Sequence, residues 1–411
     1  MSFQHGISGL NSTSKALDSI ANNIANTATV GYKAGSLRFQ DLFNASRNAN
    51  QVGGGTLVGK VHYNFDQGNI KATANPLDLA IGGNGFFLMT RPDGSVAYSR
   101  NGQFDLDRDG FIVNAGGDRL MGYGIDPLNP GVIQQGALPV PLQVPTVGMN
   151  PRATTELMIS ANLDARHATP TVTPFDPTDV ESYNAVTSSQ VFDSQGNPHT
   201  LSMFFVKNDA NAWTLHFTLD GTTLNDTRAL NFATDGSLVT DPDPFAAPLT
   251  IPAAPGSALA GVNDLVLDLG GTRMSQWGSP FAVTGAVQDG YASGELTGLS
   301  VDAEGRILGI YSNGISNRAL GQIQLATFRN PNGLTPIGGN LWTETFASGE
   351  RVIGTPNTGL NGGIMSGMVE ESNVNLTNEL VDMITFQRNY QANAQSIRAQ
   401  DQVLQTLVSL R

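Results

Sequence analysis

Two heptad-spaced stretches, one at each end of the chain, constrain this fold more than any other sequence feature. In both stretches, mainly apolar residues recur at alternating steps of three and four. This spacing places them along one stripe of an α-helix and is typical of a coiled-coil seam. The seam consists of Phe3, Ile7, Leu10, Leu17, Ala21 and Ile24 at one end, and of Leu376, Leu380, Met383, Tyr390, Ala394, Ile397, Leu404 and Val408 at the other. We expect residues 1–28 and 374–411 to form an inner helical domain by pairing with each other or with other copies. The alternative is that each helix packs only on the β domains.

The amino-terminal part of the seam lies in a segment with few helix-forming residues. Residues 2–28 carry Gly, Ser, Thr and Asn at many positions, and these residues are unfavourable in a helix interior. We therefore expect this segment to be largely disordered in a free chain and helical where copies surround it. Gly31 is expected to end the helix and to begin a connector, and Asn375 is expected to cap the carboxy-terminal helix.

The long middle of the chain has the pattern of β-structure. The sequence contains 47 Gly and 21 Pro, and short apolar strands alternate with turn residues. Asp93–Gly94, Asn101–Gly102 and Asp109–Gly110 are pairs that favour tight hairpins. The predicted fold class is therefore α+β multidomain, with helical ends and two mainly β domains between them.

A length of 411 residues also predicts more than one domain. We expect residues 29–71 to be a connector with at most a short hairpin. An intermediate β domain is expected from 72–145 together with 290–373. The outer β domain, at 146–289, would be inserted within the intermediate one.

The composition excludes several functions. The net charge of −13, with no basic stripe, disfavours binding to nucleic acid or to an anionic membrane surface. The sequence contains no cysteine, which removes disulfides, thiolate catalysis and Cys-based metal sites. No apolar run approaches the roughly 20 residues that span a bilayer, so no membrane insertion is expected. The start lacks the pattern of a secretory signal peptide, so we expect export, if it occurs, by another route.

Two short motifs have the spacing of ligand-binding loops, and each has a simpler interpretation. Residues 54–61 match G-x-x-x-x-G-K, but Val61 replaces the magnesium-binding hydroxyl residue and a strand pattern follows. Asp105, Asp107 and Asp109 match the start of a calcium loop, but Gly116 stands where the bidentate Glu belongs. We predict a tight hairpin turn at the second motif, with weak calcium binding as the open alternative.

No set of residues in the sequence assembles a catalytic site. The five His residues are scattered, with neither metal-ligand spacing nor a neighbouring pair of carboxylates. No nucleophile, base and oxyanion site can be grouped from the remaining motifs. We therefore predict no catalytic residues, no metal, no cofactor and no enzymatic activity.

Three segments together resemble the axial proteins of the bacterial flagellum, and among them the hook proteins. They are ANNIANTATVGYK at 21–33, LDLAIGGNGFFLM with the following strands within 77–123, and VNLTNELVDMITFQRNYQANAQSI at 374–397. The first segment resembles the amino-terminal signature of that superfamily. Its signature and connector positions in this sequence are Asn22, Asn23, Asn26, Gly31 and Tyr32. Rod and hook proteins share these segments, and the length and the middle insertion favour the hook.

The resemblance implies a subunit that self-assembles into a hollow, curved tube, which acts as a universal joint between motor and filament. It implies contacts with the rod below, with junction proteins above, and with the hook cap and export apparatus during assembly. It also implies an extracellular location after flagellar type III export without a cleaved signal peptide. The alternatives are a distal rod or hook–filament junction subunit of the same superfamily, and a secreted β-rich adhesin or enzyme.

Overall fold

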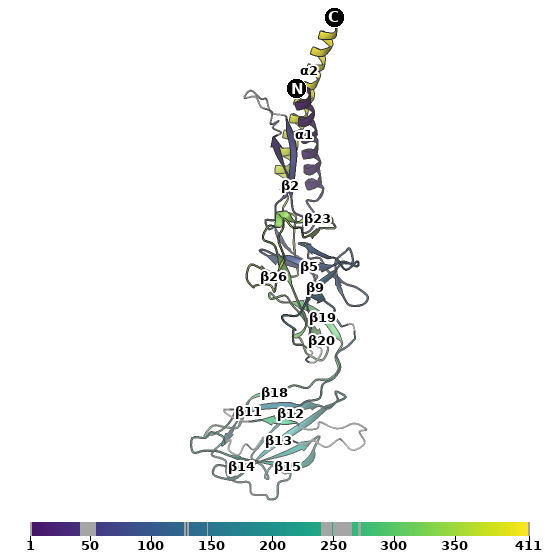
Figure 1. Ribbon diagram of the computed structural model, residues 1–411. Coiled ribbons are helices and arrows are strands. Elements are labelled where there is room, and N and C mark those ends of the chain that lie inside the picture. Colours follow the sequence, from purple (N-terminus) through teal and green to yellow (C-terminus); the bar gives the residue numbers. More distant parts are fainter. Residues whose placement is uncertain are drawn as a thin grey trace. The chain divides into compact units, whose positions relative to one another are not determined.

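The protein is a mixed α+β structure with mainly β domains and one helix near each end (Figure 1). The computed structural model describes residues 2–41, 55–126, 129, 131–145, 147–239, 249, 265–269 and 273–409, and side chains only between 4 and 406. The chain divides into two compact units. The first unit is Met1–Thr146 with Thr297–Ile310 and Ile315–Arg411, and the second is Val147–Leu296 with Tyr311–Gly314.

The two terminal segments form helices that pack side by side in opposite directions. Helix α1 spans Ser2–Ala25 and helix α2 spans Leu376–Ser409. Near the start of α1, a Cβ atom at Gly6 would lie 2.7 Å from Ile397, whereas Asn23 near its end bonds to Glu379 at the start of α2. Close packing at Gly6 and Gly9 is therefore possible because these residues lack side chains.

The ends of the two helices differ in how well the sequence predicts them. Asn375 caps α2 as expected, because its Oδ1 accepts hydrogen bonds from the backbone N–H groups of Thr377 and Asn378. The expectation that Gly31 ends the first helix was wrong, since α1 ends at Ala25. The side chain of Asn26 bonds back to the carbonyl of Asn22, and turns continue from there to Gly31.

The first unit contains a hairpin next to the helices. Strands β1 (Gly35–Asp41) and β2 (Thr56–Tyr63) pair antiparallel from Gly35↔Tyr63 to Asp41↔Thr56. Two further two-stranded pairs join distant parts of the chain. They are β3 (Ile70–Ala72) with β27 (Met368–Glu370), and β4 (Leu79–Gly82) with β26 (Gly363–Ser366).

The main sheet of the first unit has the path β19-β20-β21-β9-β5-β6-β24-β23, with five short strands attached beside it. Its strands are β5 (Phe86–Thr90), β6 (Val96–Ser99), β7 (Asp105–Leu106), β8 (Ile112–Val113), β9 (Arg119–Tyr123), β10 (Val140–Pro141), β19 (Leu296–Val301), β20 (Arg306–Tyr311), β21 (Arg318–Ile323), β22 (Leu325–Thr327), β23 (Thr335–Gly338), β24 (Leu341–Thr343) and β25 (Val352–Gly354). An aromatic core lies against it, with Phe86, Tyr98, Phe328 and Trp342 buried. A 3₁₀ turn, η2 (Pro331–Gly333), precedes β23.

The second unit has a core of its own between two four-stranded sheets. One sheet has the order β12-β13-β14-β15, and in the other β11 pairs with β16, β17 and β18. The strands are β11 (Glu156–Asp164), β12 (Ala185–Phe192), β13 (Pro198–Asp209), β14 (Ala212–Leu219), β15 (Thr222–Asn231), β16 (Val266–Asp268), β17 (Met274–Trp277) and β18 (Ala282–Gln288). Trp213, Phe205, Phe217 and Leu157 are fully buried in this core.

The segments that lead into and out of the second unit run antiparallel to each other. Met149 pairs with Gly294, and Arg152 pairs with Tyr291 through both backbone hydrogen bonds. The main segment of the second unit is Val147–Leu296. The sequence predicts an outer β domain at 146–289, and this assignment stays a prediction.

The predicted turns are confirmed at two of the three Gly-containing pairs. Gly94 and Gly110 adopt φ values of +82° and +83°, in the hairpins β5–β6 and β7–β8. Asn101–Gly102 is not a hairpin, because β6 and β7 do not pair with each other. Instead, Gly102 lies so close to the carbonyl of Leu79 that no Cβ fits there.

The two candidate loop motifs are parts of β-structure. In the second motif, Asp107 Oδ1 accepts hydrogen bonds from the N–H groups of Asp109 and Phe111, so the carboxylate holds the turn. In the first, residues 56–61 belong to strand β2, and Gly54 lies outside the described residues. Within the described ranges, no group of three His, Asp or Glu side chains has the geometry of a metal site. Among the described helices, none is long and apolar enough to cross a membrane.

Candidate functional site

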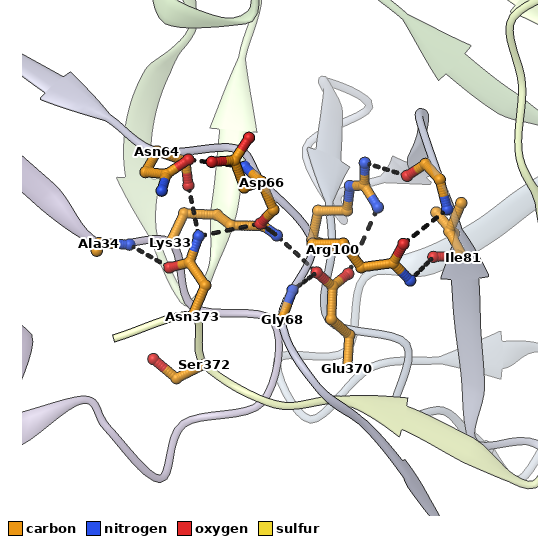
Figure 2. A network of polar contacts seen from close by, with 12 residues as sticks. Lys33, Ala34, Asn64, Asp66, Gly68, Ile81, Arg100, Glu370, Ser372 and Asn373 are labelled. Carbon is orange, nitrogen blue, oxygen red and sulfur yellow. Dashed lines mark hydrogen bonds and ion pairs between the residues drawn. The ribbon is translucent and has the colours of Figure 1, made fainter. Parts of the chain in front are cut away.

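A buried ionic cluster joins the amino-terminal segment that follows α1 to the strand that precedes α2. The side chains of Lys33 and Glu370 are each 1% exposed, and Lys33 Nζ lies 2.6 Å from Glu370 Oε1. Arg100, from the loop after β6, places Nη1 3.4 Å from Glu370 Oε2. Figure 2 shows the three side chains meeting between strands of the first unit.

Backbone groups complete this cluster. Lys33 Nζ donates to the carbonyl of Asp66 at 2.8 Å, and Arg100 Nη2 donates to the carbonyl of Gly83 at 2.8 Å. The N–H of Gly68 donates to Glu370 Oε1 at 2.8 Å. Burial lowers the pKa of Lys33, and the Glu370 carboxylate opposes that shift. Two cations thus share one carboxylate, and carbonyl dipoles supply the remaining stabilisation.

Gly31 makes the approach of the two segments possible. Its N–H donates to the carbonyl of Glu370 at 2.7 Å, and its φ of +70° favours glycine. A Cβ atom at this position would lie 2.5 Å from the backbone nitrogen of Asn101. Any larger residue would therefore push the amino-terminal segment away from the loop that carries Arg100.

Asn373 also connects these segments, from the carboxy-terminal side. We call the region where the segments after α1 and before α2 meet the junction. Its Oδ1 accepts from the N–H of Ala34 at 2.8 Å, and its Nδ2 donates to the carbonyls of Asn64 and Asp66 (Figure 2). A single amide therefore bridges the segment after α1, the segment after β2 and the segment before α2.

Asn23 makes a second bridge, closer to the helices. It is 3% exposed, its Nδ2 donates to Gly35 O and to Glu379 Oε1, and its Oδ1 accepts from Gly35 N and Tyr32 Oη. The buried amide thus links α1, α2 and the start of β1. Burial raises the pKa of the Glu379 carboxyl and of the Tyr32 hydroxyl.

The five signature positions take two different places in the structure. Asn23, Gly31 and Tyr32 belong to the junction, whereas Asn26 Nδ2 donates to Asn22 Oδ1 at 2.7 Å in an exposed pair. Sequence reasoning assigned no role to Lys33, Arg100, Glu370 or Asn373. The available signal was weak: Lys33 is a charged residue at the end of a segment with little charge.

The seam residues are only partly brought together within one chain. On α1, Leu10, Leu17 and Ile24 are half-buried, whereas Ile7 and Ala21 are exposed. The buried residues of α1 are Gly6, Ser12, Thr13, Ala16, Ile20 and Asn23, and all of them except Ser12 lie one residue before a heptad position. This face is buried because the glycines admit α2 closely, and because Ser19 and Asn23 bond to Gly35 at the start of β1.

On α2, one side faces α1 and much of the rest is exposed. Met383, Ala394 and Ile397 are half-buried, while Leu376, Leu380, Tyr390 and Leu404 are 42–55% exposed. The side chains of Phe3 and Val408 lie outside the described residues. Helix α2 therefore has several apolar side chains that remain exposed in the single chain.

Comparison with known proteins defines the class. Four family models match, namely "Flagella basal body rod protein" at 3–33, "Flagellar hook protein FlgE/F/G D1 domain" at 80–162, "Flagellar basal body protein FlaE D2 domain" at 162–291 and "Flagellar basal body rod FlgEFG protein C-terminal" at 365–410. These matches place the chain among the proteins of the flagellar rod and hook.

Relatives over the full length narrow this class. The chain is 39% identical to the flagellar hook protein FlgE of Escherichia coli and 40% identical to that of Salmonella typhimurium, covering all of both chains. It is 32% identical to the hook protein of Brucella suis, over 99% of this chain and 98% of that one. The chain belongs to the flagellar hook protein family. Its fold is similar to the crystal structure of Helicobacter pylori FlgE2, with a TM-score of 0.55 at 15% identity, covering 73% of this chain and all of that one.

Proposed function

We propose that this chain is the structural subunit of the bacterial flagellar hook. Many copies assemble into a hollow, curved tube that couples the motor to the filament as a universal joint. The full-length similarity to hook proteins of several bacteria supports this role. In this proposal the subunit is not an enzyme and uses no cofactor.

The observation that carries the assembly proposal is the set of exposed apolar side chains on α2. Leu376, Leu380, Tyr390 and Leu404 are exposed in the single chain, and so are Val381, Ile384 and Val403. Complete burial of a fully exposed apolar side chain stabilises by roughly 1.5–3 kcal/mol, and these side chains, which are 42–59% exposed, would each gain part of that, so repeated contacts between copies favour association. The seam residues of α1 and α2 then pack in a coiled-coil inner domain built from several chains.

In this proposal, the two compact units supply the intermediate and outer domains of the subunit. The β part of the first unit serves as the intermediate domain, and the second unit serves as the outer domain, inserted between its two halves. The main segment of the second unit, Val147–Leu296, lies in sequence between two parts of the first unit and supports this arrangement.

A distal rod or hook–filament junction subunit is the second candidate from the same superfamily. The match at 162–291 to the D2 domain model, together with the compact second unit, favours the hook. The surrounding partners are then the rod below, the junction proteins above, and the hook cap and export apparatus during assembly. The subunit functions outside the cell after flagellar type III export without a cleaved signal peptide.

Electron microscopy after seeded polymerisation of the purified chain tests the proposal. Curved tubes are expected for a hook subunit, whereas straight tubes would assign the chain to the rod. A chain that stays monomeric under seeding would contradict both assignments. Circular dichroism adds a second measurement, because the polymer is expected to be more helical than the free chain.

A further inference from the structure

Most of the excess negative charge of the chain lies in the second unit. Residues 147–296 contain 16 Asp and Glu but only 5 Lys and Arg, whereas the rest of the chain contains 19 Asp and Glu and 17 Lys and Arg. Residues 311–314, the other segment of the second unit, contain no charged residue. The net charge of −13 is therefore mainly a property of the second unit, and the first unit is nearly neutral.

The five basic residues of the second unit, all of them described by the structure, are engaged within that unit. Each arginine pairs with a carboxylate, in the pairs Arg152–Asp289, Arg166–Asp164, Arg228–Asp226 and Arg273–Asp268. Lys207 is buried, and its Nζ donates to the carbonyls of Ala165 and His167 at 2.6 and 2.8 Å. These cations therefore do not offset the other carboxylates of the unit.

Seven carboxylates of the second unit form no ion pair with a residue that the structure describes. They are Glu156, Asp176, Asp179, Glu181, Asp209, Asp235 and Glu295, and all except the half-buried Asp179 are exposed. Hydrogen bonds from Thr178 and Ser237 hold the pKa of Asp176 and Asp235 below the ordinary value, so both stay ionised. The surface of the second unit thus carries uncompensated negative charge.

Assembly brings these charged units of different copies close to one another. Packed helices lie about 8–10 Å apart, and a folded domain of about 150 residues has a radius of gyration of about 15 Å. Charges act over about 30 Å at an ionic strength of about 0.01 M, but over only about 8 Å at about 0.15 M. Second units of adjoining copies therefore repel strongly in dilute salt and weakly in concentrated salt.

We propose that the second unit electrostatically opposes assembly, so that ionic strength controls whether the polymer forms. Copies attract one another through the apolar side chains of α2 in the first unit and repel one another through the carboxylates of the second unit. Screening weakens the repulsion and leaves the apolar contacts in place. The inference rests on the proposed function, since the repulsion acts between copies in one polymer.

The salt dependence of seeded polymerisation tests this inference. For the unmodified chain, the critical concentration is expected to fall at least about tenfold between about 0.02 M and about 0.3 M NaCl. The combined variant Glu156→Gln, Glu181→Gln and Glu295→Gln removes three charges from the second unit. Its critical concentration should be severalfold lower than that of the unmodified chain at the lower salt concentration and similar to it at the higher one.

The three glutamate side chains are exposed and form no ion pair with described residues, so thermal unfolding of the free variant should be unchanged. The matched control removes three charges from the first unit. It combines Asp41→Asn, Asp105→Asn and Glu350→Gln, which are also exposed and form no ion pair with described residues. This control is expected to keep the full salt dependence, because its second units still repel.

The outcomes separate this inference from the proposed function. A critical concentration of the unmodified chain that does not change with NaCl would overturn the inference and leave the hook assignment intact. Equal salt dependence of the two triple variants would do the same. Failure of the unmodified chain to polymerise on seeds at every NaCl concentration would overturn the hook assignment itself.

Discussion

At the scale of single residues, Glu370 and Glu371 are neighbours in sequence with opposite surroundings. Glu370 is buried between Lys33 and Arg100, whereas Glu371 makes an exposed pair with Lys71 at 3.6 Å. Removing one partner of a buried ionic cluster leaves charges without compensation, whereas exposed pairs contribute little. The stability of the junction therefore depends on the carboxylate of Glu370 and not on that of its neighbour Glu371.

Glu370→Gln is expected to lower the free energy of unfolding by about 3–5 kcal/mol, because two buried cations lose their counter-charge. The matched variant Glu371→Gln is expected to change it by less than about 1 kcal/mol. Urea unfolding of the unpolymerised chain measures both. Equal effects of the two variants would show that the buried cluster does not stabilise the junction.

His199 predicts a pH dependence in the second unit. Its Nδ1 lies 2.7 Å from Asp220, which raises the pKa of the imidazole above its ordinary 6.5 and lowers that of the Asp220 carboxyl below 3.8. The raised pKa stabilises the fold fully below pH 6.5, and this contribution is lost as the pH rises through the folded-state pKa. The lowered carboxyl pKa acts only at the acid end, where stability is lost as the pH falls below about 4.

His199→Gln should therefore destabilise the protein more at about pH 5.5 than at about pH 8.5. Urea unfolding of variant and parent at both values gives the difference. Burial lowers the pKa of His216, but this residue is present in both proteins and cancels in the comparison. A loss of the same size at both pH values would contradict the pairing.

At the scale of elements, the sequence predicted both helices but not the face by which they meet. Heptad spacing is a local property, so the helices and the Asn375 cap could be found directly. The buried face of α1 is one position off because Gly6 and Gly9, which carry no apolar signal, admit α2. The hairpins at Gly94 and Gly110 could likewise be predicted from neighbouring residues. Gly102 is needed because its backbone lies against the carbonyl of Leu79, and no local sequence pattern predicts this contact.

The close approach at Gly6 gives a prediction for the helix pair. Gly6→Leu should displace α2, because even a Cβ would lie 2.7 Å from Ile397, and should therefore reduce polymerisation severalfold. Gln4→Leu adds a similar side chain at an exposed position of the same helix and serves as the control. Sedimentation of polymer after seeding measures both variants, and equal yields would argue against a role for this contact.

At the scale of the whole molecule, the candidate site joins segments that are far apart in the chain. Lys33 and Glu370 are separated by 337 positions, so no local pattern links them. Composition and turn chemistry predicted β-rich domains between helical ends, but not which side chains would be buried at the junction. Lys33 was visible in sequence as a charge, and only the tertiary structure gives it a partner.

The second unit should fold by itself. Residues 147–296 have their own buried core around Trp213, and Arg152 pairs with Tyr291 near the two ends. Expressed alone, this segment is expected to unfold in one cooperative transition in urea. Its tryptophan fluorescence should shift mainly because Trp213 becomes exposed, since Trp277 is already 59% exposed in the fold. In the complementary experiment, residues 1–146 are joined to 297–411 through a short Gly-Ser linker, and the unfolding of this polypeptide in urea is measured. Absence of a cooperative transition in 147–296 would show that this unit needs the rest of the chain.

The pairing of Arg152 with Tyr291 has a practical consequence for attaching foreign domains to the polymer. Residues that exchange both backbone hydrogen bonds have Cα atoms about 5.5 Å apart, so the chain leaves this unit almost where it entered. A foreign domain with similarly close termini should therefore be graftable at this point. Seeded polymerisation of such a fusion would then array an enzyme or an epitope at the regular spacing of the subunits.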